Sequence, residues 1–137
     1  MSAETQSGYM LLFKGTDWHK GLSPEEMQKI AGLWMDWFKK LSDQGTAVAG
    51  HPLESTGKII SGKNGRTVAD GPFAESKEAI GGYFMLNVKT LEEAVAIGQQ
   101  CPGLAYGATV EVRPLLEVCP MMKEENASSR ESVPAGA

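Results

Sequence analysis

The chain contains only two cysteines and two histidines among its 137 residues, and this scarcity narrows the chemistry open to it. Cys101 and Cys119 each precede a proline and share no CxxC spacing, so neither a redox motif nor a zinc site is indicated. We expect both to be reduced thiols with a structural role. Because His, Cys and carboxylate residues are not clustered at ligand spacings, we expect no metal ion, and the sequence indicates no other cofactor.

Long apolar runs are absent as well. None approaches the roughly 20 residues that a helix needs to span a bilayer. Residues 1–7 are polar and include Glu4, without the basic and apolar regions of a signal peptide. We therefore expect a cytoplasmic protein that has no membrane partner.

The chain also has no surplus of positive charge. Thirteen Lys and Arg residues against 17 Asp and Glu give a net charge of −4 at pH 7, and a field of that sign repels nucleic-acid phosphates. Direct nucleic-acid binding is therefore not expected. The length and the 42% of hydrophobic residues suit one soluble globular domain, whereas residues 121–137 have the composition of a disordered tail.

Two capping boxes mark the starts of two helices. Ser23-Pro24-Glu25-Glu26 and Thr90-Leu91-Glu92-Glu93 each place a hydroxyl residue three positions before a glutamate, which satisfies free amides at a helix N-terminus. Apolar residues recur at helical spacing from Met27 to Leu41, and Gly45 supplies a left-handed stop. The second helix is expected to end near Cys101.

Short apolar or alternating runs bounded by turn residues predict the strands. They are residues 9–13, 46–53, 58–61, 66–69, 83–88 and 109–113. The Asn64-Gly65 pair between the third and fourth runs is typical of a tight hairpin.

The two halves of the chain resemble each other. Tyr9 and Tyr83 each open an apolar strand that leads to a capped helix, so the chain reads as two β-α-β units. Two such units sharing one sheet give a ferredoxin-like (split β-α-β) α+β fold, an antiparallel sheet with both helices on one face. Because the other face is left bare, we expect a second copy to cover it in a homodimer.

Five segments of the sequence resemble the YCII-related proteins of the DGPF type. They are residues 9–12, 22–27, 70–78, 81–84 and 110–114, the third beginning with Asp70-Gly71-Pro72-Phe73. The resemblance covers residues 8–118, which we take as the single domain, preceded by the short polar segment 1–7. It implies the ferredoxin-like fold of the dimeric α/β-barrel superfamily.

The resemblance implies no settled reaction. Some YCII relatives are similar to small lyases or dehalogenating enzymes with a proposed His-Asp pair, and DGPF proteins are linked by association to sigma-factor-dependent transcription. The proposed His of such relatives lies on the first helix, and this chain has no histidine between Pro24 and Gln44. Asp36 lies on that helix, but its position opposite the apolar stripe indicates a solvated carboxylate.

Asp70 and His51 are the candidate catalytic residues. His51 lies at the end of a predicted strand, where a neutral imidazole can transfer protons near pH 7, although it can equally be a half-exposed loop histidine. Asp70 heads a sharp, amide-exposing turn, where it can bind a ligand or accept the amides of its own turn.

Five further residues are candidates for substrate binding. Gly71, Pro72 and Phe73 complete the turn, although Phe73 also suits core packing, and Tyr83 and Arg113 can orient an anionic or phenolic ligand through their donors. Trp34 and Trp37 are interpreted as packing residues and not as an aromatic box for a cofactor.

Two functions of different classes remain open. The first is a small dimeric protein that binds a small organic molecule in the cleft between helices and sheet, with weak acid/base chemistry of a cofactor-independent, lyase-like or dehalogenase-like kind. The second is a non-catalytic interaction or regulatory dimer, associated with sigma-factor-dependent transcription as the resemblance suggests.

Overall fold

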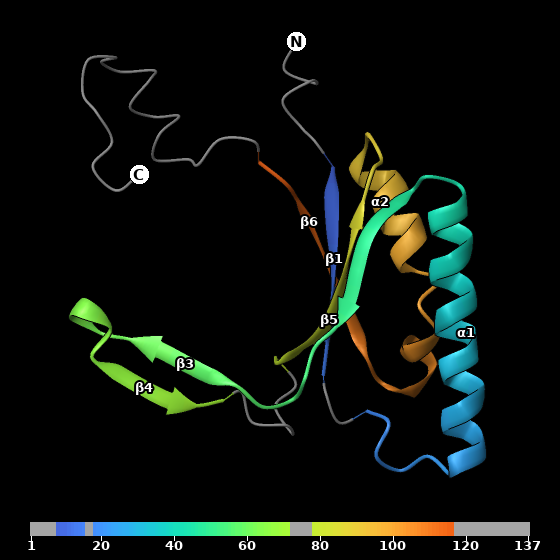
Figure 1. Ribbon diagram of the computed structural model, residues 1–137. Helices are drawn as coiled ribbons and strands as arrows, with labels where there is room; N and C mark the ends of the chain where they lie inside the picture. The colour runs from blue at the N-terminus through green and yellow to red at the C-terminus, as the bar shows by residue number, and fades with distance from the viewer. Residues whose placement is uncertain (1–7, 16–17, 72–77, 117–137) are drawn as a thin grey trace, which may run out of the picture.

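The structure, a computed structural model, describes residues 8–15, 18–71 and 78–116 (Figure 1). Its elements in chain order are β1 (Tyr9–Lys14), α1 (Pro24–Asp43), β2 (Ala47–Pro52), β3 (Lys58–Ser61), the 3-10 helix η2 (Lys63–Gly65), β4 (Thr67–Asp70), β5 (Ile80–Leu86), α2 (Leu91–Gly98), the 3-10 helix η3 (Pro102–Tyr106) and β6 (Thr109–Pro114). No helix in this part of the chain is long and apolar enough to cross a bilayer. The segments predicted at residues 1–7 and 121–137, and Cys119, lie outside the described residues.

Four strands form one antiparallel sheet in the order β2-β5-β1-β6. Both α-helices cover the same face of this sheet, and the described residues leave the opposite face uncovered (Figure 1). This order and layering are those of the split β-α-β arrangement. The predicted ferredoxin-like α+β fold is therefore confirmed.

The two helix starts follow from the capping boxes seen in the sequence. The Ser23 hydroxyl accepts from the Glu26 N–H at 3.1 Å, and the Glu26 carboxylate accepts from the Ser23 N–H at 2.9 Å. Thr90 and Glu93 make the same reciprocal pair at α2. Hydrogen bonds from the amides of Lys89 and Thr90 lower the pKa of the Glu93 carboxyl, which stays ionised next to the positive end of the helix dipole.

The core lies between the helices and the covered face of the sheet. Alternation along β1 buries Tyr9, Leu11 and Phe13, and β5 buries Phe84 and Leu86 on the same face. The α1 stripe supplies Ile30, Trp37 and Leu41, whereas Met27, at the predicted start of the stripe, is 40% exposed. Apart from Ile30 and Met27, these residues form the larger part of the core cluster between the helices and the sheet.

Trp37 is a packing residue, as predicted. Its side chain is 7% exposed, and its ring stands 5.0 Å from that of Phe84, centroid to centroid. Its indole N–H donates to the Gln100 side-chain oxygen at 3.2 Å, which ties α1 to the residues that follow α2. A buried indole donor is thus satisfied without water.

Strands β3 and β4 form a separate two-stranded ribbon inserted between β2 and β5. We call residues 58–70 the arm. The predicted hairpin is confirmed, and its connection is one residue longer than the predicted 62–65: it runs from Gly62 to Arg66 through η2, with Asn64 in the left-handed region at φ 60°. Every residue of the arm is exposed, and the arm extends well away from the sheet (Figure 1).

Candidate functional site

A cavity of about 770 Å³ opens between α1 and one end of the sheet. Its walls come from the ends of β1, β2 and β5, from the middle of α1, and from the segment that precedes α1. The lining residues are Phe13, Gly15, Trp18, His19, Lys20, Trp34, Met35, Phe38, Gly50, His51, Pro52, Leu53, Glu54, Ser55, Gly81, Gly82, Tyr83 and Phe84. A concave site of this size matches the range that small organic ligands occupy.

Aromatic rings make up the deep wall of the cavity. The ring of Phe13 meets that of Trp34 edge to face at 4.7 Å and that of Phe84 at 4.8 Å, and Phe38 lies 4.8 Å from Phe84. Trp18 adds a further ring from the segment before α1. These contacts lock the rings of the wall against one another, so the apolar surface is preformed.

Glycine residues on β2 and β5 leave space for these rings. A Cβ atom at Gly50 would lie 2.7 Å from Cδ1 of Phe84 and 2.8 Å from Cε1 of Phe38. A Cβ atom at Gly82 would lie 3.1 Å from the carbonyl oxygen of His51. Glycine at position 50 therefore lets the edge strand approach the aromatic wall directly.

His51 and Tyr83 form the polar pair at the cavity. They are direct cross-strand partners on β2 and β5, and His51 Nδ1 lies 2.8 Å from the Tyr83 hydroxyl. Because Gly50 and Phe84 face α1, alternation directs the side chains of His51 and Tyr83 toward the uncovered face. The pair thus borders the cavity at the edge of the sheet and is open to solvent on the other side.

Asp70 lies outside the cavity and away from the His51–Tyr83 pair. It ends β4 at the root of the arm, where the Lys58 ammonium donates to its carboxylate at 2.5 Å. It is not among the residues that line the cavity, so the structure does not bring Asp70 and His51 together within this chain. Gly71 is buried and donates its N–H to the Gly57 carbonyl at 3.0 Å. Pro72 and Phe73 lie outside the described residues.

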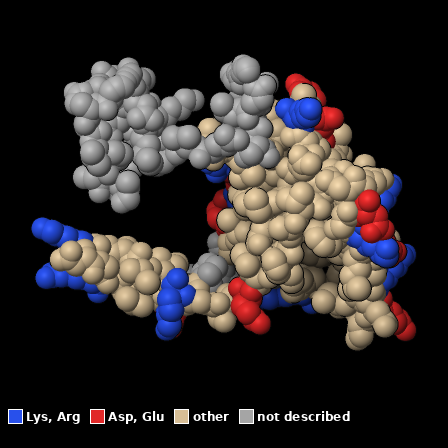
Figure 2. Space-filling view, turned by 45° about the horizontal axis from the view of Figure 1, so that its top comes forward, with Lys and Arg blue, Asp and Glu red and all other residues tan. Residues whose placement is uncertain are grey.

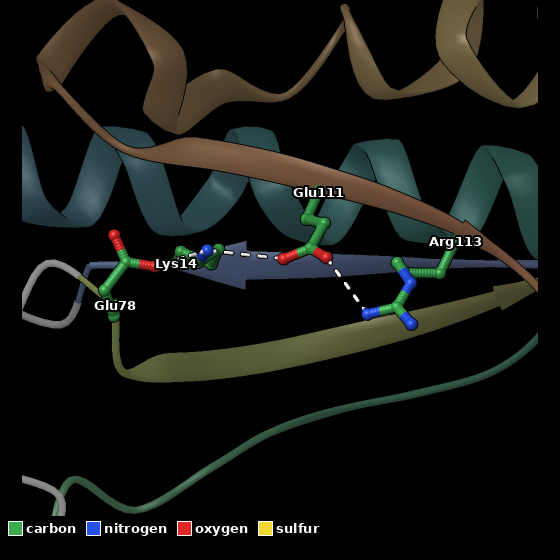
Figure 3. A network of polar contacts seen from close by, with 4 residues as sticks. All are labelled: Lys14, Glu78, Glu111 and Arg113. Atoms are coloured by element: carbon green, nitrogen blue, oxygen red, sulfur yellow. Dashed lines mark hydrogen bonds and ion pairs between the residues drawn. The ribbon is translucent and has the colours of Figure 1, made fainter.

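Arg113 belongs to a network on the uncovered face (Figure 3). Its guanidinium donates to Glu111 at 3.1 Å, and the Lys14 ammonium bridges Glu111 at 3.3 Å and Glu78 at 2.6 Å. Two hydrogen bonds lower the pKa of the Glu111 carboxyl, the larger effect coming from Lys14 and the smaller from Arg113. Hydrogen bonds to Glu78 and then Glu111 raise the pKa of Lys14. Arg113 does not line the cavity.

The aromatic lining was missed by the sequence reasoning, which treated Trp34 as packing alone. Trp34 both packs on Phe13 and lines the cavity. One feature of the sequence could have indicated this lining. Gly50 and the Gly81-Gly82 pair have no side chains, whereas the helix that packs on their strands is rich in large aromatic residues. Within residues 8–15, 18–71 and 78–116, no three His, Cys, Asp or Glu side chains group as metal ligands.

Comparison with known proteins gives one family. The model of the YCII-related domain matches residues 8–118, which is most of the chain. No curated protein matches the sequence.

Proposed function

The chain belongs to the YCII-related family, and we propose that it binds a small organic molecule with an anionic or phenolic group in the cleft between α1 and the sheet. The observation that carries the proposal is the cavity of about 770 Å³, which has an aromatic deep wall and a His-Tyr pair at its edge. Apolar pockets with a few convergent polar groups are the usual form of small-molecule sites.

The two parts of the cavity would recognise two parts of such a ligand. An apolar or aromatic body would pack against the rings of Trp34, Phe38 and Phe84. Its polar group would reach the rim, where His51, His19 and Lys20 offer nitrogen donors to a carboxylate or a phenolate. A planar ligand with one anionic or phenolic group therefore suits the site better than a sugar or a nucleotide, whose many hydroxyls or phosphates would lose water without replacement.

The same pair supports weak acid/base chemistry. If Nδ1–H of His51 donates to the Tyr83 hydroxyl, Nε2 is free to accept a proton from the ligand, and if Tyr83 donates its O–H to Nδ1, Nε2 carries the ring proton and can donate it. The described residues provide no carboxylate bonded to His51, so the imidazolium would gain no charged stabiliser. We assign no step to Asp70, because it lies on the arm within this chain.

A thermal-shift and calorimetric screen with small phenols, aromatic carboxylates and matched neutral arenes tests the proposal. We expect saturable binding of phenols or carboxylates, weakened about 10-fold by Tyr83→Phe or His51→Gln, because each removes about one hydrogen bond. Asp70→Asn is the matched control and should leave binding unchanged. A flat response across the library, or binding that depends on Asp70 and not on His51, would contradict the proposed site.

The uncovered sheet face favours a homodimer as the second part of the proposal. It carries the half-buried apolar side chains of Met10, Leu12 and Met85, which alternate with the buried core residues on the same strands. A sheet face of this kind is commonly covered by a second layer. If the ligand screen is flat, this dimer is better described as a non-catalytic interaction module, the alternative that includes a link to sigma-factor-dependent transcription. The buried free thiol of Cys101 suits the cytoplasmic location that we also propose.

A further inference from the structure

The arm carries apolar side chains that nothing in the described part of the chain covers. Ile60 and Val68 are 65% and 58% exposed, and Ile59 is 49% exposed. Ile60 and Val68 are direct cross-strand partners, so they form one apolar patch on one face of the ribbon. An isolated two-stranded ribbon is marginally stable in water, and here it presents β-branched residues to solvent.

The arm lies on the same side of the four-stranded sheet as the uncovered face (Figure 1). In Figure 1 the helices lie on one side of the sheet and the arm leaves on the other, and Figure 2 shows it standing clear of the body. Among the described residues, the arm and the uncovered face thus border one corner of the molecule (Figure 1). A body seated on the sheet face would lie alongside the arm.

We propose that a second copy of the chain occupies this corner, so that each arm grips the partner of a symmetric dimer. This inference rests on the homodimer proposed above and adds the arm as a part of its interface. In a two-fold dimer each copy contributes the same surfaces, so both sheet faces and both arms are covered at once.

The size of the sheet face supports a role for the arm. Four strands about 4.8 Å apart and about 20 Å long give a footprint of roughly 400 Å². A standard-size interface buries roughly 800 Å² of accessible surface from each partner. The face alone falls short of that area, and the arm is the exposed apolar surface next to it that can supply the difference.

Charge also favours a second copy. The uncovered face balances Lys14 and Arg113 against Glu78 and Glu111, so two such faces do not repel each other. The arm carries three basic residues and one acidic residue, a net charge of +2, whereas the other described residues carry seven basic and nine acidic, a net charge of −2. Basic side chains gather at the free end of the arm (Figure 2), where a partner body of opposite charge would attract them.

Sedimentation equilibrium of the full chain over a concentration series tests the arm. We expect a wild-type dimer at micromolar concentration, and Ile60→Asp with Val68→Asp should raise its dissociation constant at least about 30-fold, as for the loss of one interface hot spot. The control is Leu33→Asp, which places one such negative charge at a 45% exposed apolar position on α1 and should leave the dimer intact.

A photo-crosslinking residue at position 60 keeps the test decisive if the double variant misfolds. Irradiation of the purified chain should yield a covalent dimer from position 60 and none from position 33. A wild-type monomer at micromolar concentration would overturn both the homodimer and the arm. A dimer that survives the arm variant and gives no crosslink from position 60 would overturn the arm alone and leave the sheet-face dimer standing.

Discussion

The arm differs from the body, by which we mean the four-stranded sheet and its two α-helices, in how far its apolar strand residues are buried. In the body, Leu11 and Leu86 are 0% and 1% exposed, because helices close over the sheet. On the arm, Ile60 and Val68 are more than half exposed, although their strands pair in regular register. Strand pairing alone therefore buries little, and a second layer decides whether an apolar side chain reaches a core.

The same contrast separates the two faces of the sheet. The covered face holds interlocked rings and excludes charge, whereas the uncovered face mixes methionines with a four-residue ionic network. A sheet face that stays in solvent usually carries few apolar side chains, and a sheet face that is buried in a core usually carries few charged ones. The mixed composition is typical of a surface that meets another protein.

The largest effect should come from the covered face. Phe84→Ala removes the ring that contacts Phe13, Trp37 and Phe38, and we expect the free energy of unfolding to fall by about 3–5 kcal/mol. Urea unfolding at a concentration where the chain is monomeric measures it. Ile60→Ala under the same conditions should change the value by less than about 0.5 kcal/mol. Equal losses from the two variants would show that the arm packs as tightly as the body.

A smaller effect is expected at the entry to β1. Gly8 has φ +143°, and a Cβ atom there would lie 2.4 Å from the carbonyl oxygen of Leu86. Gly8→Ala should therefore lower the free energy of unfolding by about 1–3 kcal/mol. Gly32→Ala, with nothing within 4 Å of the new methyl group, is the control and should stabilise α1 by about 0.5–1 kcal/mol. A neutral Gly8→Ala would mean that β1 can shift away from β5.

Helix capping should matter less than either. Thr90→Ala breaks the reciprocal pair with Glu93 and should lower the free energy of unfolding by about 1 kcal/mol in thermal or urea unfolding. Thr90→Ser keeps the acceptor and is the matched control, expected to behave as the wild type. If alanine and serine gave the same stability, the hydroxyl would not be the group that caps α2.

The smallest effect belongs to the ionic network. Because the pKa of Glu111 is lowered on folding, its contribution to stability is present above about pH 4.5 and is lost as the pH falls through the lower, folded value. The raised pKa of Lys14 acts in the opposite range, with stability lost as the pH rises through a value above 10.5.

Glu111→Gln should therefore reduce stability slightly at pH 7 and flatten the acid limb of the stability profile, and added salt should shrink the difference because the Glu111 side chain is partly open to solvent. The urea midpoint of the dilute chain at pH 7 and pH 3.5 measures it, with Lys39→Gln as the control for an exposed pair on α1. An unchanged acid limb would remove Glu111 from the groups that govern acid stability.

Much of the fold could be predicted because local signals agreed. Both capping boxes, the strand expected from the apolar run at residues 9–13 and the hairpin signal at residue 64 each appear in the structure. The hairpin connection is one residue longer than the predicted 62–65, because Arg66 lies in the turn and β4 begins at Thr67. Gly62, Asn64 and Gly65 all take positive φ within it.

The site was less accessible to sequence reasoning. His51 and Tyr83 were both candidates, but their contact depends on the pairing register of β2 and β5, which no local pattern fixes. Asp70 was a candidate because of its turn, and its partner Lys58 is set by the register of the arm. The aromatic lining arises from elements far apart in the chain, so only the assembled fold brings it together.

Hydrogen exchange of the arm at two protein concentrations compares the two regions directly. Amides of residues 58–70 and of the body are followed by mass spectrometry below and above the concentration at which the chain associates. A second copy gripped by the arm predicts that exchange in the arm slows at least about 10-fold on association, while amides of β1 and α1 change little. Equal exchange in the arm at both concentrations, with a dimer present in the concentrated sample, would contradict it.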